Sequence, residues 1–131
     1  APTLVEKVRE IISQQPWILG AIQRLSVLLI NSPQSPEELN EGVELVERTT
    51  EADPDNPFAY RVLALGYARQ DRLNDAVSAV RNSIRLEPNE IVFRQQLVEL
   101  LNAMGRTDEA RAVMNEAQQL QKQLQQSQPT P

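Results

Sequence analysis

Cysteine and histidine are both absent from the 131 residues of this chain. Their absence excludes disulfides, thiolate nucleophiles and zinc–thiolate sites, and it removes the commonest general base and the commonest transition-metal ligand. We therefore expect a protein that is not an enzyme and that needs no cofactor and no metal. Aromatic residues make up only 4% of the chain, so its core must come mainly from leucine, valine, isoleucine and alanine.

A basic surface is also lacking, because 13 lysines and arginines face 18 aspartates and glutamates for a net charge of −5. Nucleic-acid binding needs a basic footprint, so no nucleic-acid partner is expected. The most apolar run, residues 17–30, is too short and too interrupted for direct membrane insertion. The chain begins at Ala1, which fits either a removed initiator or a targeting or anchoring segment ahead of it. The sequence leaves the compartment open, with a soluble cytoplasmic protein slightly favoured.

Prolines and short polar clusters divide the chain into helical segments. Helix-start signals at Thr3, at Ser35 with Pro36, and at Asn56 with Pro57 each precede apolar residues at helical spacing. Breaks at 70–72, 88–89 and 105 separate further apolar runs, and Thr107 is expected to cap the last helix. No strand pattern competes, so we predict seven helices joined by short turns.

The chain repeats itself with a period of 34 residues, the distance between Pro54 and Pro88. Other pairs at this spacing keep large residues large and small residues small: Leu63 and Leu97, Ala76 and Ala110, Val80 and Met114, Ser83 and Ala117. A pair of helices buries one face internally and needs a neighbouring pair to cover the other. The small positions let the helices of a pair approach closely.

This pattern resembles the tetratricopeptide repeat (TPR) family, specifically over 57–120 and more weakly over 17–56. The first clear repeat supplies Tyr60, Leu63, Ala64, Tyr67, Ala76, Val80, Ser83 and Pro88, and the second supplies Leu97, Val98, Leu101, Gly105, Ala110, Met114 and Ala117. Asp71 stands where the family has glycine, Arg94 where it has a bulky residue, and Lys122 where it has proline. An upstream, degenerate repeat aligns in its second helix through Gly42, Val46, Thr49 and Pro54. Its first helix aligns through Ile22, Leu25, Ser26 and Leu29 only with an insertion of about four residues between the two helices.

The resemblance implies an all-α fold, a short right-handed superhelix (α-solenoid) of about three TPR-like hairpins plus an N-terminal helix. We expect a single domain over 1–126 and a frayed tail over 127–131. Within the domain, 1–16 forms the extra helix, 17–56 a degenerate repeat, 57–89 a repeat, and 90–124 a repeat with a capping helix.

The resemblance also implies a non-enzymatic module for protein–protein interaction or assembly, which binds a partner protein or peptide through the concave groove. The groove positions carried over to this sequence are Arg24, Phe58, Arg61, Leu65, Arg69, Gln95, Gln96, Glu99 and Asn102. Here arginine could clamp a carboxylate, Phe58 and Leu65 could make apolar contact, and the amides could donate hydrogen bonds. The alternative is that Arg61 and Arg69 are simply solvated.

Two other surfaces are candidates. Residues 37–55 carry eight acids against Arg48, which is typical of a solvated helix face but could also dock a basic partner. We expect five glutamates on the outer side of the helix over 36–52: Glu37, Glu41, Glu44, Glu47 and Glu51.

The second is the nearly all-apolar helix over 17–30, which we expect the first helix to cover on one side and the acidic helix on the other. If the first helix is displaced or exchanged between copies, the alternative function is structural self-association, giving a homo-oligomer. The apolar spacing in the C-terminal helix favours capping of the solenoid or a short coiled-coil seam.

Overall fold

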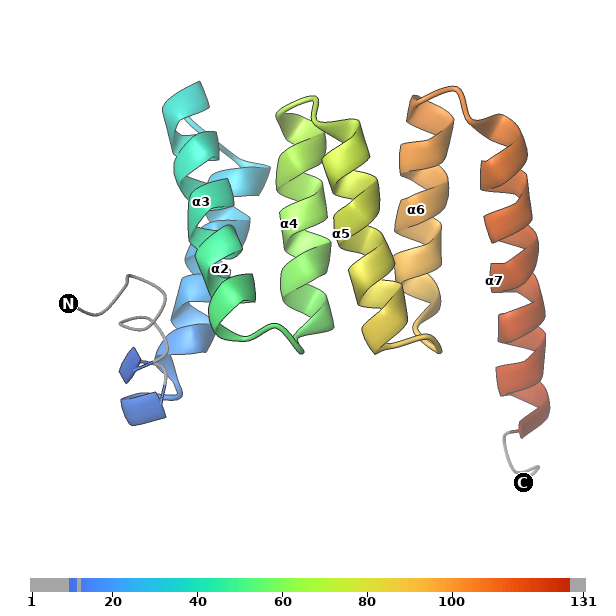
Figure 1. The fold of residues 1–131 in the computed structure, drawn as a ribbon, viewed down its shortest axis with the longest axis horizontal. Coiled ribbons are helices and arrows are strands. Elements are labelled where there is room, and N and C mark those ends of the chain that lie inside the picture. Colours follow the sequence, from blue (N-terminus) through green and yellow to red (C-terminus); the bar gives the residue numbers. More distant parts are fainter. Residues whose placement is uncertain (1–9, 12, 128–131) are drawn as a thin grey trace.

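The computed structural model describes residues 10, 11 and 13–127. Its helices are α2 (Ile18–Asn31), α3 (Pro36–Ala52), α4 (Pro57–Arg69), α5 (Leu73–Leu86), α6 (Ile91–Ala103) and α7 (Thr107–Ser127). Figure 1 shows them following one another along the long axis of the molecule in chain order, with α2 behind α3. Successive helices pack against each other, and α2 also contacts α4. The predicted all-α solenoid is confirmed, whereas most of the extra N-terminal helix expected over 1–16 lies outside the described residues.

Local capping explains where the helices begin. The Ser35 hydroxyl accepts a hydrogen bond from the Glu38 backbone N–H at 3.2 Å, and Pro36 follows as the first helical residue. The Asn56 side chain likewise accepts from the N–H groups of Phe58 and Ala59, at 3.1 and 3.3 Å, ahead of Pro57. These bonds satisfy donors that the first helical turn leaves unpaired. Both starts were predicted, whereas Thr107 is already the first residue of α7 rather than a cap ahead of it.

The backbone hydrogen bonds of the turn inside one hairpin recur 34 residues later in the turn inside the next. At the end of α4 the N–H of Arg72 donates to the Tyr67 carbonyl at 2.8 Å, and at the end of α6 the N–H of Arg106 donates to the Leu101 carbonyl at 2.8 Å. This is the long bond of a Schellman ending, which needs one residue with a positive φ. Gly105 supplies it with φ 74° in the second turn, and Asp71 supplies it with φ 63° in the first.

The turns between hairpins repeat in the same way. The Asp53 N–H donates to the Thr49 carbonyl at 2.8 Å, and the Glu87 N–H donates to the Ser83 carbonyl at 2.9 Å. Pro54 and Pro88 each follow directly. The two proline-containing stretches are therefore the same joint between successive hairpins.

Ile30 lies at the point where α2, α3 and α4 meet, and its side chain is fully buried. Two glycines make this meeting possible. A Cβ at Gly42 would lie 2.9 Å from the Leu29 Cβ, and a Cβ at Gly66 would lie 2.7 Å from Val43 Cγ2. Both distances are shorter than carbon atoms tolerate, so the helices pack at a separation that only glycine permits.

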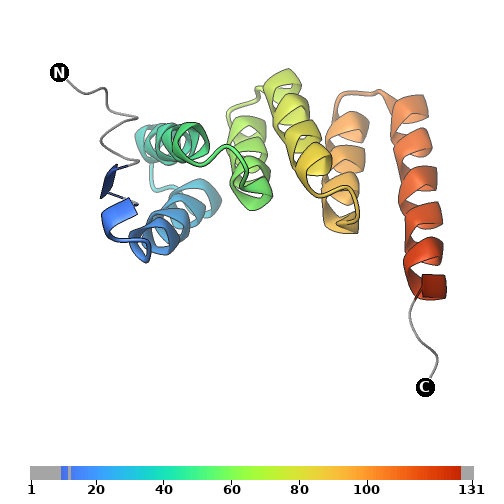
Figure 2. The same ribbon diagram turned by 60° about the horizontal axis from the view of Figure 1, so that its bottom comes forward.

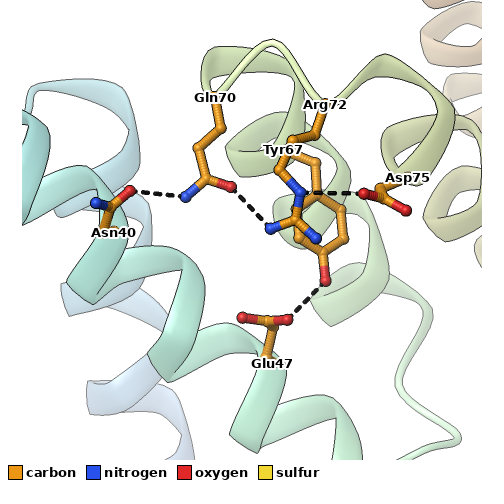
Figure 3. Close-up of polar contacts among 6 residues, drawn as sticks. All are labelled: Asn40, Glu47, Tyr67, Gln70, Arg72 and Asp75. Atoms are coloured by element: carbon orange, nitrogen blue, oxygen red, sulfur yellow. Dashed lines mark hydrogen bonds and ion pairs between the residues drawn. The ribbon is translucent and has the colours of Figure 1, made fainter.

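A polar network joins α3 to the turn between α4 and α5 (Figure 3). The Tyr67 hydroxyl donates to the Glu47 carboxylate at 2.8 Å, and the Arg72 guanidinium lies 4.2 Å from the centre of the Tyr67 ring. Burial raises the pKa of the Tyr67 hydroxyl from 10.0 to about 12, and the bond to Glu47 and its negative charge add to this effect. Glu47 therefore lies at the joint between two hairpins, and its assignment to the outer acidic face was wrong.

Helix α2, and Trp17 directly ahead of it, leave apolar surface exposed: Trp17, Leu28 and Leu25 are 72%, 62% and 49% exposed. The first helix, which was expected to cover one side of α2, lies mostly outside the described residues. The physical reason is that α2 stands at one end of the described array, where α3 and α4 cover only one side of it. A solenoid buries a helix face only where a neighbour is present.

Helix α6 holds two residues whose roles the sequence did not reveal. Phe93 is completely buried and is the largest such side chain in the described chain. Arg94 occupies its bulky position with a side chain that is only 16% exposed, and its guanidinium lies 3.9 Å from the Glu116 carboxylate of α7. The methylene stem of an arginine can pack like an apolar side chain while its charged end meets a partner.

Candidate functional site

A groove with a volume of about 760 Å³ runs across the first helix of each hairpin. Its lining comes from α2 (Val27, Asn31), α4 (Phe58, Arg61, Val62, Ala64, Leu65, Ala68), the first residue of α5 (Leu73) and α6 (Val92, Gln95, Gln96, Glu99, Leu100, Ala103). The floor is mostly apolar, and charged and amide groups stand around it. In Figure 2 the same helices can be followed from a second direction.

Six of the nine residues expected in a groove line this one: Phe58, Arg61, Leu65, Gln95, Gln96 and Glu99. Arg24, Arg69 and Asn102 are exposed but do not line it. Arg69 is the last residue of α4, and Ala68 directly before it lines the groove instead.

Sequence reasoning missed several lining residues, including Asn31, Val62, Ala68, Leu73, Leu100 and Ala103. A strict 3.6-residue period would have found part of this set, since Ala68 follows Arg61 and Leu65 at spacings of seven and three. Leu73 could not be found in this way, because it belongs to the second helix of its hairpin. It lies beside the groove because it directly follows the turn between α4 and α5.

The groove carries few charged side chains, and the two opposite charges lie on different helices. Arg61 on α4 and Glu99 on α6 are both exposed, and Arg61 makes no ion pair with any residue in the described part of the chain. A guanidinium beside an apolar floor can bind a carboxylate through two parallel hydrogen bonds. The groove can thus offer an acidic ligand a charged contact that no residue of the described chain occupies.

Gln96 links the two helices that form the walls. Its side-chain N–H group donates to the backbone carbonyl of Arg61 at 3.1 Å, while its side-chain oxygen is buried without a hydrogen-bond partner in the described chain. This bond holds α6 against α4 beside the arginine and contributes to the spacing of the groove walls.

Phe58 lines the groove and is 51% exposed. Its ring meets the buried Phe93 ring edge-on, with the centroids 5.6 Å apart and the planes at 65°. This edge-to-face geometry is the favoured arrangement of aromatic pairs. The contact fixes the position of an aromatic ring that still presents about half of its surface to solvent.

The other candidate surfaces offer less. On α3, Glu37, Glu41, Glu44 and Glu51 are exposed, and Glu44 pairs with Arg48 at 2.5 Å. Within the described residues, no group of three acidic side chains is placed to hold a metal ion. In the same part of the chain, no helix is both long enough and apolar enough to cross a bilayer.

Comparison with known proteins shows the fold. No protein-family model matches the chain, and a search of curated proteins finds no match. Among solved structures, a point mutant of MamA has a TM-score of 0.69 at 20% identity, over 88% of this chain and 82% of that chain. MamA from Desulfovibrio magneticus RS-1 has a TM-score of 0.72 at 19% identity, over 87% of this chain and 62% of that chain.

MamA of strain AMB-1 has a TM-score of 0.69 at 19% identity, over 90% of this chain and 68% of that chain. At such low identity the likeness speaks for the fold alone, a helical repeat of the tetratricopeptide type. A fold of this class is compatible with many partners, so the function has to be argued from the groove.

Proposed function

We propose that this protein is a non-enzymatic interaction module that binds a peptide segment of a partner protein in the groove formed by α2, α4 and α6. The observation that carries the proposal is the combination of an apolar floor with an unpaired Arg61 in a cavity of about 760 Å³. Sites of a few hundred to a thousand cubic ångströms with few, well-placed polar groups are typical of ligand pockets. The charge of Arg61 favours a segment that carries at least one carboxylate.

The proposal is tested with peptides selected from a random displayed library on the wild-type protein. Charge reversal by Arg61→Glu should weaken their binding at least tenfold. The matched control is Arg81→Glu, the same change at an exposed arginine on α5 that does not line the groove. Equal binding by both variants and the wild type would refute the groove as the working surface. Arg69→Glu tests in addition whether the end of α4 contributes.

A second candidate function is self-association through the exposed apolar residues Leu25 and Leu28 of α2 and Trp17 directly ahead of it. Exposed apolar patches of this kind often mark interfaces. Helix α7, by contrast, has a single large apolar residue among its described residues that is exposed, Met114 at 43%. Light scattering of the wild type and of Leu28→Glu distinguishes the candidates, since a dimer that dissociates in the variant supports assembly and a monomer in both leaves only the groove.

A further inference from the structure

A second, smaller cavity of about 200 Å³ lies between α2, α3 and α4. We call it the side pocket. Its lining is Gln23, Ser26, Val27, Val46, Thr49, Phe58, Ala59 and Val62. Three of these residues, Val27, Phe58 and Val62, also line the groove. The side pocket is thus a recess that adjoins the groove on the α2 side of Phe58.

The walls of the side pocket have few free hydrogen-bonding groups for water. Its two buried hydroxyls are already used, because Ser26 donates to the Ile22 carbonyl at 2.8 Å and Thr49 donates to the Leu45 carbonyl at 2.9 Å. The other buried lining residues, Val46 and Ala59, are aliphatic, and the half-buried Gln23 amide is the remaining polar side chain. An apolar cavity of about 150 Å³ engineered in another protein holds benzene. The side pocket is therefore large enough for one phenyl or isobutyl group.

The placement of this recess relative to Arg61 defines a ligand. Phe58 and Arg61 are three residues apart on α4, so they lie on neighbouring turns of the same face. A bound segment that places a carboxylate at Arg61 has its adjacent residues beside Phe58 and the mouth of the side pocket. The edge contact with Phe93 fixes the orientation of the Phe58 ring beside the recess.

We propose that the side pocket is the anchor site for one large apolar side chain of the bound peptide, phenylalanine, leucine or methionine, within a few residues of the carboxylate that meets Arg61. This inference rests on the proposed function and names the chemistry of its ligand. A side chain that leaves water completely on binding contributes most of the affinity in small interfaces, as buried anchors do. The groove alone would not specify such a residue.

The first test uses benzene as the probe. Methyl NMR signals of Val27, Val46 and Val62 are followed while benzene is added to the wild type, to Gln23→Phe and to Gln23→Ala. Gln23 is half-buried and lines the side pocket but not the groove, so a phenyl ring there should fill the recess without touching Arg61. We expect saturable shifts in the wild type and in Gln23→Ala and none in Gln23→Phe. Circular dichroism checks that each variant is folded, and Gln23→Leu replaces the phenylalanine variant if it is not.

The second test uses the selected peptides that Arg61→Glu weakens. Replacing their apolar anchor by alanine should weaken binding to the wild type tenfold or more. Gln23→Phe should bind the parent peptide with a similar loss of affinity. It should bind the alanine peptide only slightly more weakly than it binds the parent peptide. This lack of additivity places the anchor in the side pocket.

Each other result overturns the inference in a distinguishable way. Peptides that depend on Arg61 but bind Gln23→Phe as tightly as the wild type would refute the anchor site and leave the groove standing. Absence of benzene shifts in the wild type would show that the recess is closed. If no selected peptide is sensitive to Arg61→Glu, the proposed function fails and the anchor site fails with it.

Discussion

Alanine at Gly66 tests how tightly α4 packs against α3. Glycine in a helix costs about 0.8–1.0 kcal/mol relative to alanine, so substitution at an unobstructed site stabilises the protein. At Gly66, however, the new Cβ would lie 2.7 Å from Val43 Cγ2 and 3.1 Å from Ile30 Cδ1. Val43 is 1% exposed and Ile30 is fully buried, so neither side chain has free space into which to move.

The matched control is Gly20→Ala in α2, where no atom lies within 4 Å of the new Cβ. We expect Gly20→Ala to raise the free energy of unfolding by up to about 1 kcal/mol. Inserting a carbon into a filled core costs about 1–3 kcal/mol, so Gly66→Ala should be less stable than Gly20→Ala by about that amount. The difference between the two variants largely removes the helix-propensity gain and isolates the cost of the close contact.

Urea unfolding followed by circular dichroism measures both variants and a double variant, Gly66→Ala with Val43→Ala. Removing Cγ2 of Val43 gives the new methyl group space, so the double variant should be more stable than the sum of the single changes by about 1 kcal/mol. If Gly66→Ala stabilises the protein as much as Gly20→Ala does, the helices are not packed as closely as the structure has them and the reasoning is refuted.

Three further changes probe the joints between helices. Asp71→Gly should stabilise the protein by about 0.5–1 kcal/mol, because Asp71 has a φ of 63° that glycine adopts without strain; a lower urea midpoint would contradict this. Asn56→Ala should cost about 1 kcal/mol by removing the cap of α4, measured in the same way against Asn56→Ser. Tyr67→Phe should cost about 1 kcal/mol at pH 7 through the lost bond to Glu47. Because the folded-state pKa of Tyr67 is raised to about 12, its neutral form is favoured by folding, and this contribution is complete below about pH 10 and lost as the pH rises towards 12. After allowance for solvent screening, the wild type should lose about 1 kcal/mol more than Tyr67→Phe over that range, and parallel pH profiles would refute the assignment.

Helix boundaries could be predicted from the sequence because the signals that set them act within a few residues. Ser35 and Asn56 bind N–H groups only two or three residues ahead, and Gly105 supplies its positive φ by itself. The repeat was equally accessible, since hairpins that pack in the same way need large and small residues at the same positions. The backbone bonds of the two hairpin turns coincide at the 34-residue spacing for this reason.

Burial and the composition of the groove were less accessible, because they depend on neighbours that lie far away in the chain. Glu47 has the spacing of a solvent-facing acid, yet it meets Tyr67 twenty residues later. Phe93 has no distinguishing signal in the sequence, but in the fold its fully buried ring meets Phe58 of α4. Arg69 matches a simple four-residue spacing, yet Ala68 lines the groove in its place.

The sequence by itself determined that this protein is a repeat of helical pairs, where each pair begins and ends, and that it carries no histidine or cysteine. Those properties follow from local capping, backbone conformation and residue type. Only the tertiary structure decided that one face of α2 is exposed, that Arg61 rather than Arg69 lines the groove, and that an apolar recess adjoins it beside Phe58. The physical reason is that a cavity and an exposed face are properties of the space between helices, which depends on their rotation and separation and on which neighbours are present.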